Sequence, residues 1–376
     1  MGRTTGAAEA SEAIEATEAS EPKKSDGTDR APRPTRRRTH GWRRALLATL
    51  VTGAVVVPLA GAARPEIPAP APAAVAARVT SATLDEAYAA NRANAAEASR
   101  MAEAHGNRER AAADRAMADP ARHILTFDGR GLGLATEVFG DLAHADRIAV
   151  LVPGSDTSID TYDRFRDAAG ALHERLTREA PQGTRTAVVA WLGYETPATV
   201  STTVATAGRA EDAAPKLREF IRQLRALTAS SGRHEPSART DGKPTDSPHR
   251  RPHISLLCHS YGSVVCGRAA SHLDVDDIAL VGSPGTGADT AAALHTPARV
   301  WAGRGSDDWV AEVPHIKLDL LGTTVGFGTD PVSPSFGARV FAAGGGGHSD
   351  YFRPGSTSLA NLTRIVLGET SEVAHG

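Results

Sequence analysis

Short, mostly apolar runs alternate with amphipathic stretches from about residue 121 to the end of the chain. The apolar runs are 148–152, 187–191, 254–257, 278–281, 298–302 and 339–342. The amphipathic stretches are 160–179, 211–228, 262–273 and 287–295, and a last helix is expected at 356–367. Strands without a polar face are covered on both sides, and strands that alternate with helices form mostly parallel sheets. The pattern therefore predicts an α/β fold, with helices on both faces of the sheet, in a domain spanning 121–376.

Two further elements precede this series. Residues 123–127 and 134–139 flank a glycine-rich turn, which predicts a β-hairpin. Residues 81–120 are rich in alanine and charged side chains and carry only a thin apolar stripe. This composition predicts two helices that break at Gly106. The helices either pack on the following domain, as a brace or a lid, or form an exposed stalk.

The first eighty residues divide into three segments of different composition. Residues 1–44 are charged and have few large apolar side chains, which predicts a disordered tail. The basic second half of this tail leads directly into the uncharged run 45–63, which is the layout of a signal peptide or a signal anchor. Residues 64–80 are rich in proline and alanine and should form an extended linker. We therefore expect an exported protein, either extracellular or held at the membrane through 45–63.

Composition argues against several classes of partner. The formal net charge of −2 gives no reason to expect a nucleic acid. The chain has no CxxC spacing of the kind that binds metals, and no organic cofactor is indicated. The two cysteines, Cys258 and Cys266, are expected to be buried free thiols, with a disulfide as the alternative. The polar, proline-rich stretch 229–252 is expected to be a surface insertion.

The strongest chemical signal lies at 254–265, where an apolar strand runs through a short turn of small residues into a helix. This is the pattern of a nucleophile elbow, GxSxG, with Ser260 at its centre. The tight turn requires small residues two positions away on either side. Gly262 meets this requirement, and Cys258 replaces the first glycine. The elbow would lift the Ser260 hydroxyl above the sheet and point the N–H of Tyr261 at a developing oxyanion.

A second backbone donor is expected about a hundred residues upstream of the elbow. The strand predicted at 148–152 ends in a Pro-Gly turn. In folds built on such an elbow, the loop after this strand supplies the second oxyanion donor. The N–H of Ser155 is the preferred candidate, and that of Asp156 is the next. An ordinary turn at the end of a strand would give the same sequence.

A candidate acid follows the elbow along the chain. The strand predicted at 298–302 leads into glycine-rich residues and then Asp308. A carboxylate in this position can orient a catalytic imidazole, and Asp307 is the alternative. Asp289 and Asp330 are weaker candidates. The structural interpretation of such an aspartate is a helix N-cap.

A candidate base follows the last apolar strand. Four glycines precede His348, so this histidine lies on a loop that can reach a serine distant in the sequence. The chain order Ser260, Asp308, His348 is the order expected for this type of site. His259 neighbours the serine, but adjacent residues on an elbow point apart, so we expect a structural role for it. His315 is the other candidate base.

Together these motifs resemble those of a largely uncharacterised actinobacterial α/β-hydrolase family, over roughly residues 121–368. The resemblance rests on an ordered set of short motifs: FD at 127–128, GD at 140–141, VPG at 152–154, WLGY at 191–194, HSYGS at 259–263, GSPG at 282–285, DP at 330–331, FG at 336–337 and GHSDY at 347–351. It implies an α/β-hydrolase core with a serine triad placed as above, but no substrate. The chain departs from this pattern at Cys258, where the family that it resembles has a glycine.

We therefore expect an exported serine hydrolase that cleaves carboxylic esters through an acyl-enzyme. A thioesterase or an amidase would use the same triad, and a non-catalytic binding protein or scaffold on the same fold is the remaining alternative. The substrate would be a small-molecule or lipid-like acyl compound. Asp156, Trp191 and Tyr194 are expected at the substrate pocket, although a strand tryptophan also suits the core. Residues 195–210 fall where this fold often inserts a cap, and the sequence indicates no oligomeric state.

Overall fold

The computed structural model describes residues 67–74, 79–199, 207–231, 251–313, 318–320 and 323–376. The expected tail 1–44, the signal or anchor segment 45–63 and the candidate base His315 lie outside the described residues. Most of the insertion 229–252 and the middle of the possible cap 195–210 also lie outside them. None of the helices in the described ranges combines the length and the apolar character that a bilayer crossing requires.

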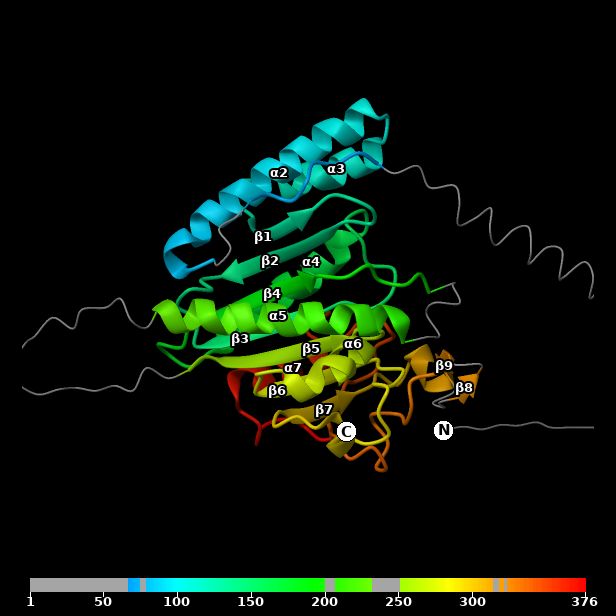
Figure 1. Ribbon diagram of the computed structural model, residues 1–376. Helices are drawn as coiled ribbons and strands as arrows, with labels where there is room; N and C mark the ends of the chain where they lie inside the picture. Colours follow the sequence, from blue (N-terminus) through cyan, green and yellow to red (C-terminus); the bar gives the residue numbers. More distant parts are fainter. Residues whose placement is uncertain (1–66, 75–78, 200–206, 232–250, 314–317, 321–322) are drawn as a thin grey trace, which may run out of the picture. The chain divides into compact units, whose positions relative to one another are not determined.

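An eight-stranded, mostly parallel sheet forms the centre of the fold (Figure 1). Its strands follow the order β1-β2-β4-β3-β5-β6-β7-β10. Strand β2 is antiparallel to both β1 and β4, and the strands from β4 to β10 run parallel. The strands are β1 (His123–Asp128), β2 (Leu134–Gly140), β3 (Arg147–Val152), β4 (Thr186–Leu192), β5 (His253–His259), β6 (Asp277–Val281), β7 (Arg299–Gly303) and β10 (Arg339–Val340). Each predicted apolar run overlaps one of these strands, so the predicted fold class is confirmed.

Four α-helices follow the parallel strands, and one predicted helix is absent. The four are α4 (Tyr162–Glu179), α5 (Gly208–Ser231), α6 (Gly262–Ala269) and α7 (Thr357–Leu367). The prediction of a helix at 287–295 was wrong, because this segment contains only the 3-10 turn η4 (Ala292–Leu294). The N–H of Ala291 donates to the carbonyl of Phe336 from a distant part of the chain, rather than to a helical neighbour. A short hairpin of β8 (Leu318–Leu320) and β9 (Thr323–Val325) was not predicted.

The parallel strands are buried on both faces. In β3, Ile148 and Val150 belong to the apolar cluster that includes side chains of α5 and α6. Ala149 and Leu151 belong to the opposite cluster, which includes side chains of α4 and α7. These four β3 residues are at most 1% exposed. A strand covered on both sides has no polar face, which is why the sequence shows continuous apolar runs rather than alternation.

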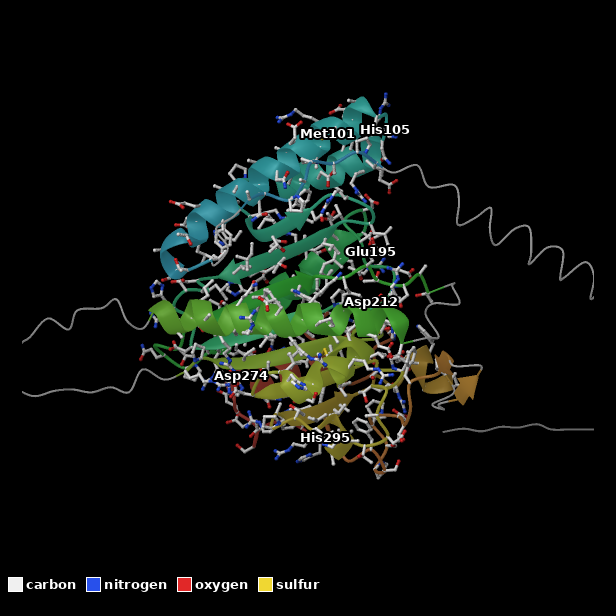
Figure 2. The ribbon with its side chains drawn as sticks, in the orientation of Figure 1. Met101, His105, Glu195, Asp212, Asp274 and His295 are labelled. Carbon is white, nitrogen blue, oxygen red and sulfur yellow. A yellow bond between two sulfur atoms is a disulfide. The ribbon has the colours of Figure 1, made fainter. Side chains whose placement is uncertain are left out.

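A helical hairpin packs on the β1 edge of the sheet. It consists of α2 (Leu84–Ala104) and α3 (Arg108–Met117), which are separated by Gly106 with a positive φ of 85°. Figure 1 shows both helices beside β1, and Figure 2 marks the C-terminal end of α2 by Met101 and His105. The amide of Asn91 on α2 donates to the carbonyl of Leu125 in β1 at 2.8 Å. The hairpin is therefore packed on the sheet and is not an exposed stalk.

One buried carboxyl in this hairpin makes stability depend on pH. Asp114 is 1% exposed, and its Oδ1 has no hydrogen-bond partner among the described residues. Burial raises the pKa of Asp114 to about 7, with Arg110 lowering it and Asp160 raising it further. The unfolded chain then binds fewer protons than the folded protein between about pH 4 and pH 7. The free energy of unfolding should therefore fall as the pH rises through this window.

Replacing Asp114 with asparagine should remove this fall in stability. The wild type is expected to lose stability between about pH 4 and pH 7, whereas Asp114→Asn should lose less over the same range. The measurement is urea unfolding at a series of pH values. Asp167→Asn, at an exposed position on α4, is the matched control and should follow the wild type. Parallel pH profiles for the wild type and Asp114→Asn would contradict the assignment.

Candidate active site

Ser260 stands on a sharp turn between β5 and α6, as the elbow pattern predicts. Its φ is +53°, a left-handed conformation that few residues other than glycine adopt. Such strain persists only where the surrounding structure enforces it. A Cβ on Gly262 would lie 2.6 Å from the carbonyl oxygen of Val152, and a Cβ on Gly154 would lie 2.6 Å from the Cβ of Ser260. Glycine at these two positions therefore lets the elbow and the loop after β3 approach closely.

The structure brings the serine, the histidine and one aspartate into a single hydrogen-bonded chain. His348 Nε2 lies 2.9 Å from the Oγ of Ser260. The other ring nitrogen, Nδ1, lies 2.9 Å from the Oδ1 of Asp308. The aspartate is 2% exposed, and the imidazole is 14% exposed. The arrangement has the form of a catalytic triad, with an imidazole able to accept a proton from the hydroxyl.

The other candidate acids do not meet the imidazole. Asp307 is exposed and hydrogen-bonds to the hydroxyl of Ser306. Asp330 is paired with Arg304 at 2.6 Å. Asp289 forms no hydrogen bond or ion pair with the imidazole. Of the four aspartates considered from the sequence, only Asp308 is bonded to His348.

Asp308 accepts three hydrogen bonds, one of them from Tyr351, whose role was not predicted from the sequence. Its Oδ1 accepts from His348 and from the backbone N–H of Val310, and its Oδ2 accepts from the hydroxyl of Tyr351. Burial raises the pKa of Asp308, but these hydrogen bonds outweigh it and hold the pKa below its usual value. Tyr351 also accepts from the N–H of Gly305. The tyrosine therefore holds the carboxylate in its ionised form and in a fixed orientation.

Removing the hydroxyl of Tyr351 should slow the reaction without unfolding the protein. Hydrogen bonds to a charged group contribute about 1.5–3 kcal/mol, so Tyr351→Phe should lower kcat by about 10- to 100-fold. Steady-state kinetics with a chromogenic ester measures the effect. Tyr88→Phe makes the same chemical change in a buried tyrosine that stacks on His123, outside the site, and should leave kcat unchanged. Equal kcat values for the two variants would contradict the role of Tyr351.

His259 supports the histidine loop, which agrees with the structural role expected for it. Its Nε2 lies 2.7 Å from the backbone carbonyl of His348, and the two rings lie 4.8 Å apart. Burial lowers the pKa of His259 to about 4, and the adjacent His348 lowers it further. The ring is therefore neutral near pH 7, and its Nε2–H donates to the carbonyl. The ring of Trp309, whose side chain is 53% exposed, lies 4.7 Å from the imidazole of His348.

The two candidate oxyanion donors in the loop after β3 differ in whether their backbone N–H is already hydrogen-bonded. The N–H of Asp156 donates to the carbonyl of Pro197 at 3.0 Å, so it is already engaged. Its carboxylate accepts from the N–H of Thr199, and its φ is +58°. Asp156 therefore anchors the turn that presents Ser155. Of the two residues considered, Ser155 is the better candidate, together with Tyr261 at the start of α6.

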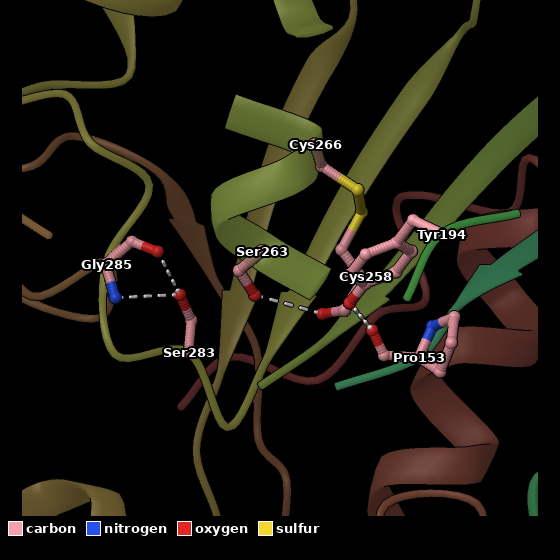
Figure 3. The surroundings of a disulfide bond; sticks show 7 residues. All are labelled: Pro153, Tyr194, Cys258, Ser263, Cys266, Ser283 and Gly285. Carbon is pink, nitrogen blue, oxygen red and sulfur yellow. Dashed lines mark hydrogen bonds between the residues drawn. A yellow bond between two sulfur atoms is a disulfide. The ribbon is translucent and has the colours of Figure 1, made fainter. Parts of the chain in front are cut away.

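A cleft of about 610 Å³ opens onto Ser260 and His348. Asp156 lies in its lining, as expected, but Trp191 and Tyr194 do not. The prediction that these two residues wall the pocket was wrong. Both belong to the buried cluster on the α5 face, and their exposures are 3% and 2%. The hydroxyl of Tyr194 donates to the carbonyl of Pro153, so it supports the start of the loop after β3 (Figure 3).

The two cysteines form a disulfide, which corrects the expectation of free thiols. The bond joins Cys258 in β5 to Cys266 in α6, and both residues are fully buried (Figure 3). The hydroxyl of Ser263 donates to the carbonyl of Cys258 across the same turn. The strand and the helix on either side of Ser260 are thus covalently joined. Within the described part of the chain, no cluster of His, Cys, Asp or Glu is arranged to hold a metal ion.

Comparisons with known proteins found similar sequences, similar structures and a matching family model. The chain is 27% identical over 278 residues to the uncharacterized protein Rv2079 of Mycobacterium tuberculosis. The alignment covers 66% of this chain but only 39% of that relative, so the chain spans well under half of its length. Esterase PE8 is similar in structure, with 18% identity and a TM-score of 0.39 over 63% of this chain and 99% of that one.

A second similar structure is XC6422 from Xanthomonas campestris, described as a serine hydrolase without lid. It has 15% identity and a TM-score of 0.38 over 67% of this chain and 95% of that one. The alpha/beta hydrolase family model matches residues 128–236 and 242–318. That match includes the elbow and Asp308 and ends before His348. On this match and on the sheet described above, the chain has the α/β-hydrolase fold.

Proposed function

We propose that this protein is an exported serine hydrolase that cleaves carboxylic esters, with Ser260 as its nucleophile. The observation that carries the proposal is the continuous hydrogen-bonded chain from Ser260 through His348 to Asp308. A serine hydroxyl is a weak nucleophile until an adjacent base accepts its proton, and such a chain supplies that base. The left-handed backbone of Ser260 supports a functional role, because strain of about 1–3 kcal/mol is typical of functional sites.

The proposed reaction has two halves. The Ser260 oxygen attacks the ester carbonyl while His348 Nε2 takes its proton, and Asp308 stabilises the imidazolium that forms. Backbone N–H groups of Ser155 and Tyr261 would donate to the oxyanion. The imidazolium then protonates the leaving alcohol, and an acyl-enzyme remains. A water molecule, deprotonated by the same imidazole, attacks the acyl-enzyme; the imidazolium then returns its proton to the Ser260 oxygen as the bond to the acyl group breaks and the carboxylic acid is released.

The cleft supports a substrate with an uncharged acyl group. Phe165 and Phe352 lie in its lining, which also carries three acidic residues, Asp156, Asp160 and Asp163, against one basic residue, Arg164. Aromatic side chains bind apolar groups, and carboxylates repel an anionic acyl chain. A volume of about 610 Å³ is in the range of small-molecule sites. We therefore propose a small-molecule or lipid-like ester with an apolar acyl group, and no nucleic-acid partner.

Hydrolysis of p-nitrophenyl esters tests this proposal. The wild type should release a burst of nitrophenol close to one equivalent per chain wherever deacylation is the slower step. Ser260→Ala should lose both the burst and the turnover, with an unchanged circular dichroism spectrum. Butyrate and octanoate esters should be cleaved faster than the hemisuccinate ester. Turnover that survives in Ser260→Ala would overturn the proposal.

Matched thioesters and anilides separate the ester hydrolase from its alternatives. Faster acylation by the thioester or by the anilide, compared at equal acyl chain, would favour a thioesterase or an amidase on the same triad. No reaction with any of the three would favour a binding protein or scaffold. We expect the ester to be preferred.

Export is proposed from the basic and then apolar layout of residues 30–63. The fully buried disulfide supports this proposal, because structural disulfides persist in oxidising compartments. N-terminal sequencing of the mature protein tests it and also separates a cleaved signal from a retained anchor through 45–63. A mature chain that begins at residue 1 or 2 and is recovered from the cytosol would contradict export.

A further inference from the structure

A fully buried arginine outside the triad connects the helical hairpin to the wall of the cleft. Arg110 lies on α3, and its side chain is 1% exposed. Its guanidinium forms a bidentate pair with Asp160, from Nε to Oδ1 at 2.7 Å and from Nη2 to Oδ2 at 3.2 Å. The same group donates to the carbonyls of Gly129, at 2.9 Å, and Gly131, at 3.1 Å. Arg110 therefore holds three separate pieces of chain together.

These contacts require the charge and the shape of arginine. Burying an unpaired charge is costly, and breaking a buried ion pair on one side costs about 3–5 kcal/mol. Only a planar fork with five N–H donors can meet a carboxylate and two carbonyls at once. Lysine would keep the charge but would lose the bidentate geometry. Asp114 lies on the same helix one turn away, but Asp160 is the carboxylate to which the guanidinium of Arg110 is bonded.

Asp160 belongs to the loop that carries the proposed oxyanion donor. The loop 155–161 follows β3, and Ser155, Asp156 and Asp160 all lie in the lining of the cleft. The hydroxyl of Thr161 donates to the carbonyl of Asp156 at 2.8 Å, which ties the two ends of the loop together. A displacement of Asp160 would therefore be transmitted to the turn that presents Ser155.

The loop also rests on the β1–β2 turn, which Arg110 fixes from the other side. The N–H of Ile159 donates to the carbonyl of Leu132 at 3.1 Å. A Cβ on Gly133, whose φ is +78°, would lie 2.4 Å from the side chain of Ile159. The turn and the loop are thus in close contact, and the guanidinium bonds both. Without the guanidinium of Arg110, the loop 155–161 and the β1–β2 turn would both lose these hydrogen bonds to α3.

We propose that Arg110 is a positioning residue for the catalytic site: through Asp160 and the β1–β2 turn, it holds the loop 155–161 where Ser155 can donate to the oxyanion. The inference rests on the proposed serine hydrolase activity. It assigns the α2–α3 hairpin a role in catalysis, although α3 lies before residue 128, where the match to the hydrolase family begins. The hairpin then supports the active site through Arg110, in addition to covering the sheet edge.

Two variants test the proposal, with a control on the same helix. Arg110→Lys keeps the buried charge but not the fork, and Asp160→Asn keeps the guanidinium bonds to the two carbonyls. The control is Arg115→Met, which removes an exposed ion pair to Glu103 on the outer surface of the hairpin. Each protein is assayed well below its melting temperature. The readouts are kcat and KM for a p-nitrophenyl ester and the second-order rate of inactivation by a fluorophosphonate.

Both variants should lower kcat and the inactivation rate by about 10- to 100-fold, because a misplaced oxyanion donor acts on the transition state. KM should change by less than about threefold, and Arg115→Met should match the wild type. If Arg110→Lys does not fold, Asp160→Asn carries the test. Folded variants with wild-type kcat and a lower melting temperature would show a purely structural role and overturn the inference. A wild type that does not react with the fluorophosphonate would instead overturn the proposed function and this inference with it.

Discussion

Replacing Asp308 with asparagine is expected to lower kcat by about four orders of magnitude, whereas Asp307→Asn should leave it within twofold of the wild type. An asparagine can keep the geometry, but its amide favours the wrong imidazole tautomer and does not stabilise the imidazolium. Asp308 accepts a hydrogen bond from His348 Nδ1 at 2.9 Å. Asp307 is exposed, and its carboxylate accepts a hydrogen bond from the neighbouring Ser306. Steady-state ester hydrolysis measures both effects.

The two aspartates form a matched pair, because they are adjacent and undergo the same isosteric change. Loss of activity in Asp307→Asn, with Asp308→Asn unaffected, would reverse the assignment of the acid. Equal and small effects in both variants would mean that His348 is not oriented by a carboxylate. The melting temperature of each variant shows whether a loss of activity arises from unfolding.

Removing the disulfide is expected to lower the free energy of unfolding by about 2–3 kcal/mol. The bond closes a loop between Cys258 and Cys266, which are eight positions apart, and a loop of this length constrains the unfolded chain by about that amount. The double variant Cys258→Ala/Cys266→Ala should show the loss in urea unfolding. Because the bond joins the strand and the helix on either side of the elbow, we expect a larger loss of unfolding free energy than from truncating a single side chain on the surface of α6.

A thiol assay is the direct control for this prediction. Ellman's reagent should find no free thiol in the denatured, unreduced wild type and two after reduction. Two thiols before reduction would contradict the disulfide and restore the expectation of free cysteines. Unchanged stability in the double variant, with the bond present in the wild type, would show that the bond does not constrain the unfolded chain.

The sequence was sufficient for the strands of the parallel sheet and for the turn between β5 and α6 that carries Ser260. The run 148–152 is apolar because β3 is covered on both faces, so its position could be predicted from local composition. Ser260 could be found because an elbow requires small residues at fixed positions along a continuous segment. These features depend on neighbours in the sequence, and each overlaps the element observed.

The features that were missed depend on distances between segments that lie far apart in the chain. Whether Cys258 pairs with Cys266 is decided by a Cα separation of 6.5 Å, which the turn between strand and helix creates. Trp191 faces the α5 layer because of the register of β4. The run 187–191 is apolar throughout, so its composition did not show which face of the sheet Trp191 takes. Tyr351 and Arg110 act through partners dozens of residues away; the GHSDY motif includes Tyr351, but neither residue's role could be predicted from its neighbours in the sequence.

We infer that Ser260 is a nucleophile activated by His348. The most direct measurement is treatment of the folded protein with a fluorophosphonate, followed by peptide mass spectrometry to locate the adduct. We expect one adduct per chain, on Ser260, absent from Ser260→Ala and formed far more slowly in His348→Ala. No adduct on the folded wild type, or an adduct that persists in Ser260→Ala, would contradict it.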